Sequence, residues 1–461
     1  RYDDEVMLAA KLAVARAVGA AARAVNRGGG TSLPGKLLMR LEPDALALLA
    51  RRLPRGSAVI SATNGKTTTA AMMASILERA DVGVVHNHAG ANMAGGVASA
   101  LLAAARPRGA IDGELGLFEV DEFWLERVVE DVDPRVLVLA NLFRDQLDRY
   151  GELETIADRW ARLVAGRPAG GALILNADDP LVADLGRERS DTRYFGVDDD
   201  GVALPELQHA ADSKHCRRCG HAYAYEAVYL AHLGRYRCPN CGQRRTDLDI
   251  CARAVELHGV RESRFELHTD VGSASVTLPL PGLYNIYNAL AAAAACLELG
   301  VGLDGVVAGL EQVSPAFGRA ETVDFEGRSL SILLIKNPAG ANEVLRTLAL
   351  EPPRLDLLAV LNDNVADGRD ISWVWDADFE LIADRVARVT CSGTRAGELA
   401  LRLRYAGVTP DRLTVVPALA DALELAAARA DGPLYALPTY TALLELRQLL
   451  ARSGHTGRYW C

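Results

Sequence analysis

The 461-residue chain has little lysine, no excess of positive charge and no long apolar run. Its 60 acidic residues outnumber its 50 basic ones, and the formal net charge is −10. This balance argues against a nonspecific nucleic-acid binder, which needs a basic surface to neutralise phosphates. No uninterrupted apolar stretch reaches the roughly 18 residues of a membrane span, so we expect no transmembrane helix. Because lysines are so few, each one is a candidate for a specific role: Lys11, Lys36, Lys66, Lys214 and Lys336.

Cysteine is scarce as well, since eight residues in a chain this long do not make a disulfide scaffold. Four of them form two C-x-x-C pairs, which indicate a metal site in a reducing compartment. The N-terminal segment begins with acids and is interrupted by Lys11, Arg16 and Arg23, a pattern that does not match a secretory signal. We therefore expect a cytoplasmic protein.

The length predicts about three units at roughly 150 residues each, and a chain that is 50% apolar can bury a core in each of them. We expect residues 1–45 to be a helical segment, whose first helix is rich in small side chains and is closed by Gly28–Gly30. The apolar face of that helix is mostly alanine, which favours docking on the main body over lying on a membrane.

Residues 46–318 alternate strand-like and helix-like patterns, which predicts an α/β domain with a mostly parallel sheet covered on both faces. Residues 205–250 interrupt this alternation and are interpreted as an insertion. Residues 319–461 resume it on a smaller scale, so we expect a second, Rossmann-like α/β domain. The strand-like runs are 59–60, Val82–Val85, Leu115–Val120, Val136–Leu139 and Ala172–Leu175, and then Ser331–Ile335, Leu357–Leu361, Arg388–Cys391, Leu413–Val416 and Leu434–Leu437.

A phosphate-binding loop is predicted at Ser61–Thr69, between a buried strand and a helix. In such a loop the backbone N–H groups and the helix N-terminus form an anion site. Lys66 would reach the β- and γ-phosphates of ATP, and the Thr67 hydroxyl would ligate Mg²⁺. Ile60 stands where the full pattern has a glycine, so the alternative is an ordinary turn before a helix.

Acidic residues follow the strand-like run Leu115–Val120, at a carboxyl end where ligands bind in this architecture. Glu119, Asp121 and Glu122 are candidate Mg²⁺ ligands, with a solvated acidic turn as the alternative. The polar stretch Asn141–Asp148 follows the next strand in the same way, and one of its acids is a candidate contact to the metal or to a phosphate-bound water.

The cysteine pairs of the insertion are Cys216/Cys219 and Cys238/Cys241. Four thiolates saturate a tetrahedral Zn²⁺ and leave no open position, so we expect a structural zinc site. Iron in the same geometry and a redox dithiol pair are the alternatives. Arginines surround the pairs, and we interpret them as a solvated basic rim, with a nucleic-acid-binding ribbon as the rival interpretation.

An acidic loop with aromatic side chains lies further on, at Asp363–Asp378. It contains five aspartates together with Trp373 and Trp375. Tryptophans in such a loop are typical of the energetic centre of a protein interface. We therefore expect the C-terminal domain to bind a partner protein.

The order of these patterns resembles the Mur ligases. The matching segments are TNGKTTT, EVDE, NLFRDQLDRYGE, LNADDP, GLYNIYNA and FGRAE. Two features, the four-cysteine insertion and the block Asn362–Glu380, make the chain similar to the synthetase subunits of lipid II amidating complexes. The resemblance covers nearly the whole chain and implies a Mur-ligase-type ATPase domain.

This resemblance implies an activity, the use of ATP, Mg²⁺ and Zn²⁺, and partners. The enzyme would phosphorylate the α-carboxylate of D-glutamate in the lipid II stem peptide at the inner membrane surface. Ammonia from a GatD-type glutaminase subunit, bound by the C-terminal domain, would then form D-isoglutamine. The glutaminase would borrow Asp370 as the acid of its catalytic triad, with Asp367 and Asp376 as the next candidates. Asp370 is also placed to cap the helix that follows it, which is the alternative role.

The resemblance also implies the remaining site residues. Lys66 and Glu119 would act in catalysis, with Glu119 and Thr67 on Mg²⁺, Asn285 on the adenine side of the nucleotide and Arg319 on its ribose or phosphates. The phosphates would be held by the loop residues Thr63, Asn64, Gly65, Lys66, Thr67 and Thr68.

The sequence departs from the family at several positions. Ala62 replaces a glycine, Gln146 a histidine and Leu333 an aspartate. No lysine lies between Lys66 and Lys214, so the carbamylated lysine usual in amino-acid-adding Mur ligases is absent from its place. This loss fits ammonia as the nucleophile. An amino-acid-adding Mur or folylpolyglutamate-type ligase is the first rival, and an ATP-binding scaffold that does not hydrolyse ATP is the second.

Overall fold

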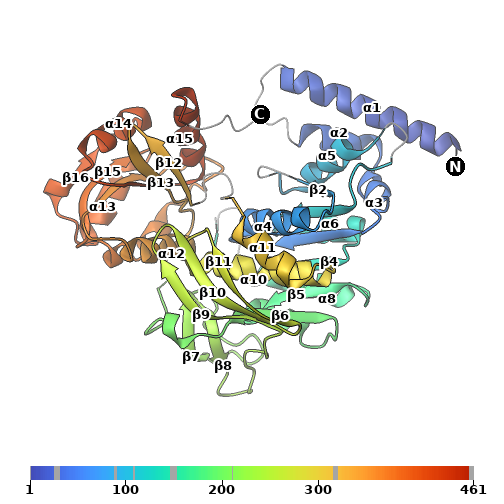
Figure 1. The fold of residues 1–461 in the computed structure, drawn as a ribbon, viewed down its shortest axis with the longest axis horizontal. Coiled ribbons are helices and arrows are strands. Elements are labelled where there is room, and N and C mark those ends of the chain that lie inside the picture. Colours follow the sequence, from blue (N-terminus) through green and yellow to red (C-terminus); the bar gives the residue numbers. More distant parts are fainter. Residues whose placement is uncertain are drawn as a thin grey trace.

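The structure is a computed structural model that describes residues 2–24, 32–87, 91–106, 110–145, 153–209, 211–314 and 320–455. It consists of a large α/β unit, which carries the N-terminal helices, and a smaller α/β unit beside it (Figure 1). The N-terminal helices are α1 (Tyr2–Ala24), α2 (Leu33–Leu41) and α3 (Ala45–Ala50). Leu8, Leu12 and Ala15 of α1 are buried in the same core as α2 and α3, as expected for a docked helix. None of the described helices has the length and hydropathy that crossing a bilayer requires.

The large unit is built on a nine-stranded sheet in the order β11-β10-β9-β6-β5-β4-β1-β3-β2. Strands β1 to β6 and β9 are parallel, so the carboxyl ends of β1, β3 and β4 meet at one edge. The antiparallel strands β10 and β11 complete one side of the sheet, and the sequence did not predict them. The strands are β1 (Ser57–Ser61), β2 (Val84–His86), β3 (Leu115–Glu119), β4 (Val136–Leu139), β5 (Ala172–Asn176), β6 (Thr192–Val197), β9 (Ile250–His258), β10 (Glu262–Thr269) and β11 (Gly272–Leu278).

Helices cover both faces of this sheet, as predicted. One core contains α4 (Lys66–Arg79), α10 (Leu283–Glu298) and α11 (Leu303–Glu311). The opposite core contains the N-terminal helices with α5 (Ala94–Ala104), α6 (Leu125–Val132), α8 (Leu153–Gly166) and the short α9 (Pro180–Ala183). The run Ala291–Ala295 of α10 is almost fully buried, because alanine side chains let this helix pack closely on the sheet and on α4.

The insertion contributes a two-stranded antiparallel hairpin outside the main sheet, β7 (Ala224–Leu230) and β8 (Leu233–Arg237). It emerges at the foot of the large unit, below the ends of β9 and β6 (Figure 1). The turn between the two strands consists of Ala231 and His232, and Ala231 adopts a positive φ of 49°. The main sheet resumes at β9, close to the predicted end of the insertion.

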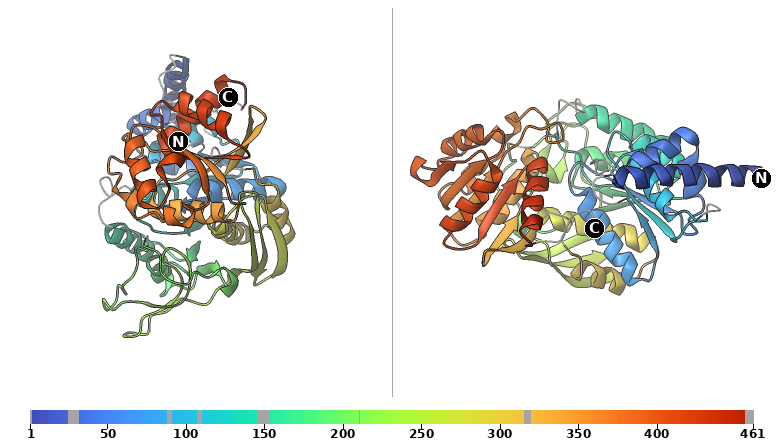
Figure 2. Two further views of the ribbon diagram at one scale, coloured as in Figure 1. Left: turned by 90° about the vertical axis from the view of Figure 1, so that its left-hand side faces the viewer. Right: turned by 90° about the horizontal axis from the view of Figure 1, so that it is seen from above.

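The smaller unit has a six-stranded sheet in the order β12-β13-β17-β14-β15-β16, parallel except for β12. It lies side by side with the large unit (Figure 2). Its core is divided by the sheet, with α12 and α13 on one face and α14 and α15 on the other. The elements are β12 (Glu321–Phe325), β13 (Arg328–Ile332), α12 (Pro338–Ala349), β14 (Leu355–Val360), β15 (Val386–Ser392), α13 (Ala396–Tyr405), β16 (Leu413–Val415), α14 (Leu419–Arg429), β17 (Leu434–Pro438) and α15 (Tyr440–Arg452).

Candidate active site

A cavity of about 520 Å³ lies between the two α/β units, at the carboxyl ends of β1, β3 and β4. The large unit lines it with the predicted phosphate loop, the turn Asp121–Trp124 and the start of α10. The smaller unit contributes Lys336, the first turns of α12 and Asp367. Of the predicted nucleotide-site residues, the structure brings seven to this one cavity: Thr63, Asn64, Gly65, Lys66, Thr67, Thr68 and Asn285. Arg319, predicted to contact the ribose or phosphates, lies outside the described residues.

The phosphate loop runs from the end of β1 to the first residue of α4, Lys66. Gly65 has a φ of 88°, and a Cβ there would lie 2.0 Å from Asn288 Oδ1, so no other residue fits this turn. Ala62 is not among the described non-glycine residues with positive φ. Its substitution for the family glycine therefore introduces no backbone strain.

Lys66 lines the cavity with its side chain 11% exposed and pairs with an acid of the neighbouring turn. Its Nζ lies 2.8 Å from Glu122 Oε2 and also donates to the carbonyl of Ala62. Burial by itself lowers the pKa of Lys66, but the carboxylates of Glu122, Asp121 and Asp145 outweigh it and hold that pKa above its usual value. The ammonium is therefore fully charged at neutral pH, as a phosphate-binding group must be.

Two residues of the smaller unit reach into the phosphate loop. Lys336 Nζ donates to the Thr63 carbonyl at 3.2 Å and lies 2.5 Å from Asp145 Oδ2. Asn337 and Asn64 exchange two hydrogen bonds between their side-chain amides, at 2.9 and 3.2 Å. The sequence analysis assigned Lys336 no contact, so its position beside the phosphate loop was not predicted. Its rarity as a lysine was the available signal.

Asparagines shape the side of the cavity formed by α10. Asn285 is buried, donates to the Pro281 carbonyl at 2.8 Å and accepts from Asn288 at 3.1 Å. Asn288 in turn accepts from the Thr69 hydroxyl at 3.3 Å. This network fixes Asn285 relative to the phosphate loop, in a position consistent with its predicted contact to the nucleotide.

Glu119 ends β3 and is 2% exposed, but it does not line the cavity directly. Asn87 holds its backbone, accepting from the Glu119 N–H at 3.0 Å and donating to its carbonyl at 2.8 Å. Among the described residues, Glu119 Oε2 has no hydrogen-bond partner. A buried carboxylate oxygen without a partner is costly, and a hard cation that takes oxygen ligands would remove that cost. Glu119 therefore fits a Mg²⁺ ion.

Asp145 is a second acid at this edge, on the stretch Asn141–Asp148 that the sequence singled out. Its Oδ2 pairs with Lys336, while its Oδ1 is buried without a partner in the described part of the chain. Gln146 and Asp148 lie outside the described residues. Asp145 is thus the acid of this stretch that the structure brings to the phosphate end of the cavity.

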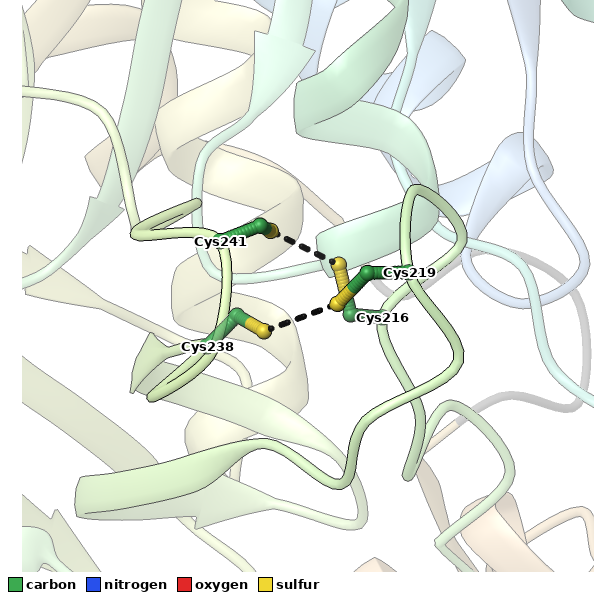
Figure 3. A group of neighbouring side chains, drawn as sticks. All are labelled: Cys216, Cys219, Cys238 and Cys241. Carbon is green, nitrogen blue, oxygen red and sulfur yellow. Dashed lines mark hydrogen bonds between the residues drawn. The ribbon is translucent and has the colours of Figure 1, made fainter.

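The four predicted zinc ligands form a compact cluster, with their sulfur atoms turned toward one another (Figure 3). All four Sγ atoms lie within 4.8 Å of one another, with Cys216–Cys241 at 3.5 Å and Cys219–Cys238 at 3.4 Å. Ligands on a tetrahedron with Zn–S bonds of about 2.3 Å are roughly 3.8 Å apart, so the donor set fits zinc. Each pair sits in a turn with a positive-φ glycine, Gly220 or Gly242.

Replacing Cys238 with serine is expected to abolish tight zinc binding and to lower the unfolding temperature. Removing a direct ligand should exceed the roughly 10–100-fold affinity loss that follows loss of an outer-shell partner. Elemental analysis of the purified chain and a thermal melt measure both effects. Cys251→Ser is the control, because Cys251 is buried outside the cluster. Full zinc content in Cys238→Ser, or iron in the unmodified chain, would contradict the zinc assignment.

Most aspartates of the acidic loop Asp363–Asp378 bind neighbouring parts of the protein and thereby hold the loop in place. Asp367 is buried and accepts from the Thr441 N–H at 2.7 Å, and Asp376 pairs with Arg144 across the units at 3.4 Å. Asp378 accepts from Asn342 Nδ2 at 2.8 Å. By contrast, Asp370 is exposed, and its Oδ1 accepts from the Ser372 N–H at 2.8 Å. This contact resembles the predicted cap, although the N-cap of the 3₁₀ helix Ser372–Trp375 is Ile371.

Asp370 remains suited to a partner, because its side chain is exposed and its hydrogen bonding is local, to Ser372 two residues further on. The Ser372 N–H lowers the pKa of Asp370, so the side chain is a carboxylate at neutral pH. Nearby, Trp375 and Tyr405 are 50% and 73% exposed, with ring centroids 5.6 Å apart. The triad role itself stays a prediction.

Comparisons with known proteins agree over most of the chain. Family models of the Mur ligase middle domain and of the MurT ligase C-terminal region match residues 60–242 and 334–443. The MurT subunit of lipid II isoglutaminyl synthase (glutamine-hydrolyzing) from Streptococcus pneumoniae is 35% identical over 426 residues, covering 92% of this chain and 93% of the relative. The MurT subunit from Staphylococcus aureus (strain N315) is 33% identical over 444 residues, 95% and 96% of the two chains.

Solved structures of Mur-type ligases share the fold. A pseudomurein peptide ligase type C from Methanothermus fervidus superposes with a TM-score of 0.68 at 23% identity, covering 87% of this chain and 79% of that one. MurF from Acinetobacter baumannii gives 0.66 at 20% identity, covering 91% and 80%. The sequence-based expectation of a Mur-ligase fold with a four-cysteine insertion is confirmed, and the chain belongs to the MurT family of Mur ligases.

Proposed function

We propose that this chain is the ATP-using subunit of a lipid II isoglutaminyl synthase and that it amidates the α-carboxylate of D-glutamate in the stem peptide. The observation that carries the proposal is the near full-length similarity to MurT subunits. It is supported by a cavity that gathers two lysines, a phosphate loop and the orphaned carboxylate oxygen of Asp145. Because lipid II is membrane-anchored, the cytoplasmic enzyme would act at the inner membrane surface.

The chemistry would proceed in two steps. A carboxylate oxygen of D-glutamate attacks the γ-phosphorus of ATP, and the bond to the bridging oxygen breaks so that ADP leaves. Ammonia then attacks the acyl carbon, loses a proton, and phosphate departs with the electrons of the C–O bond. The first step is needed because a carboxylate by itself would have to expel oxide.

The residues of this chain would supply position and charge. Lys66 and Lys336 lie at the phosphate end and would neutralise the oxygens on which charge accumulates during phosphoryl transfer. Their present partners, Glu122 and Asp145, keep both ammonium groups placed. Glu119, Thr67 and Asp145 offer oxygens to Mg²⁺, which when bound neutralises the β- and γ-phosphates.

Ammonia as the nucleophile is supported by the lysines that the cavity contains. Lys66 and Lys336 line it, and both are engaged with acids. Lys214 lies on the surface next to the cysteine cluster and does not line the cavity. The described residues therefore offer no separate lysine for the carbamate that amino-acid-adding relatives use. A GatD-type glutaminase on the Asp370 surface would deliver the ammonia.

The test is phosphate release by the chain alone with ATP, Mg²⁺ and lipid II. We expect release to require both lipid II and ammonium chloride, and the product to carry one amide on D-glutamate by mass spectrometry. Release that instead requires an added amino acid would restore the amino-acid-adding ligase. No release under any of these conditions would favour the scaffold interpretation.

A further inference from the structure

The turn of the insertion hairpin reaches the nucleotide cavity. We define the hairpin tip as Tyr229–Leu233, the last residues of β7, the turn and the first residue of β8. Leu230 and Leu233 line the same cavity as the phosphate loop, and both are nearly fully buried. The cysteine insertion is thus part of the wall of the candidate active site.

His232 ties the hairpin tip to the phosphate side of the cavity. Its side chain is fully buried, with the ring 5.0 Å from the Phe143 ring and Nε2 3.5 Å from Asp179 Oδ2. Phe143 in turn exchanges hydrogen bonds with the Thr63 hydroxyl, through its N–H at 3.1 Å and its carbonyl at 3.3 Å. The hairpin tip is therefore connected to Thr63 of the phosphate loop in two steps, from His232 to Phe143 and from Phe143 to Thr63.

The C-terminal unit holds the other side of the hairpin tip. Arg346 of α12 donates to the Tyr229 carbonyl at 2.8 Å and pairs with Glu343 at the same distance. Glu343 and Val344, on the same helix, line the cavity. The hairpin tip is thus fastened to both α/β units.

A polar network centred on Asp178 supports the start of β8. The carbonyl of Asp178 accepts from the Gly234 N–H at 3.0 Å, and its carboxylate receives Arg245 Nη1 at 2.9 Å and the Tyr287 hydroxyl at 2.8 Å. Tyr287 also lines the cavity. Because these groups are buried and fully engaged, the position of the hairpin tip is well determined.

We propose that the hairpin tip forms one wall of the purine subsite, with Leu230 and Leu233 against the face of the base. The inference rests on ATP being the nucleotide of the proposed function. With the triphosphate at the loop, the base would lie toward the start of α10, where Tyr284, Asn285 and Tyr287 line the cavity. The insertion contributes Leu230 and Leu233 to the apolar lining of this cavity, and α12 contributes Ala339 and Val344.

The experiment measures binding to the full-length chain with Mg²⁺ and no lipid II. ATP and inorganic tripolyphosphate each displace a fluorescent ATP analogue. Removing the leucine side chain should raise the Kd for ATP about tenfold, because several buried methylene groups lose contact with the base. We expect this in Leu230→Ala and Leu233→Ala, with no change for tripolyphosphate. Leu233→Met, which conserves volume, should restore ATP affinity.

Val228→Ala is the matched control, because Val228 is buried in the same hairpin but does not line the cavity. It should lower the melting temperature of the chain and leave both affinities unchanged. Unchanged ATP affinity in both leucine variants, or equal weakening of ATP and tripolyphosphate, would overturn the proposal. A wild-type chain that binds ATP but releases no phosphate with lipid II and ammonium would contradict the proposed function instead.

Discussion

Replacing Asp370 with asparagine is expected to abolish amidation driven by glutamine while leaving amidation driven by ammonium chloride at the wild-type level. In a triad the acid orients the histidine and stabilises its charged form, and its conversion to an amide lowers kcat by about 10⁴-fold. The Asp370 carboxylate is exposed and ionised, so it is available to a histidine of a docked glutaminase. Glutamate production by the two-subunit complex and phosphate release with each nitrogen source measure the difference.

Asp363→Asn is the matched control, because Asp363 lies in the same loop but is engaged with Arg395 at 3.3 Å and with Thr394. It should change neither activity by more than a few-fold. An equal loss of glutaminase activity in both variants would assign the effect to the charge of the loop. Normal glutamine hydrolysis in Asp370→Asn would leave Asp370 with only its contact to Ser372.

Replacing Lys66 with methionine is expected to lower the rate of phosphate release on the order of 10²–10³-fold, with either nitrogen source. Removing one fixed cation or hydrogen-bond donor that stabilises the charge developing in the transition state typically lowers kcat by this factor. Methionine retains most of the volume of the aliphatic part of the Lys66 side chain, so the phosphate loop should keep its conformation. The substitution also leaves Glu122 without its 2.8 Å partner, which adds repulsion against the phosphates. Steady-state phosphate release at saturating ATP and lipid II measures the effect.

Lys214→Met provides the control for loss of a lysine as such. Lys214 is exposed beside the cysteine cluster, so its replacement should leave phosphate release unchanged. If Lys214→Met instead lowered activity as much as Lys66→Met, a carbamylated lysine would have to be reconsidered. Wild-type rates in Lys66→Met would show that the loop does not act on the phosphates of ATP.

Several of the strands that the sequence predicted share one property. β1, β3, β4 and β5 are covered on both faces, so each appears in the sequence as a continuous apolar run. β10, by contrast, alternates charged and apolar residues, because only one of its faces is buried. Its neighbours β9 and β11 are similarly mixed, and the three directly follow the insertion. A search for buried runs therefore missed the antiparallel side of the sheet.

The site was predictable where it is local in sequence. The phosphate loop and the cysteine pairs each lie within short segments whose residue spacing is set by their chemistry. Lys336, His232 and the leucines of the hairpin tip acquire their roles only through packing between units. Lys336, for example, meets the Thr63 carbonyl across 273 positions of sequence. No local pattern encodes such a contact, because it depends on how two domains dock.

The reciprocal amide contact between Asn64 and Asn337 bears on how fast the site can open. Each hydrogen bond of this kind contributes only about 0.5–1.5 kcal/mol net, since water replaces it when it breaks. Both partners are uncharged amides, so the strength of the two hydrogen bonds does not depend on the charge that the nucleotide carries before or after phosphoryl transfer. These two bonds can break and re-form many times within a turnover of typical length, so the electrostatic resistance to separating the units for ADP release comes from the ion pairs Lys336–Asp145 and Arg144–Asp376 instead.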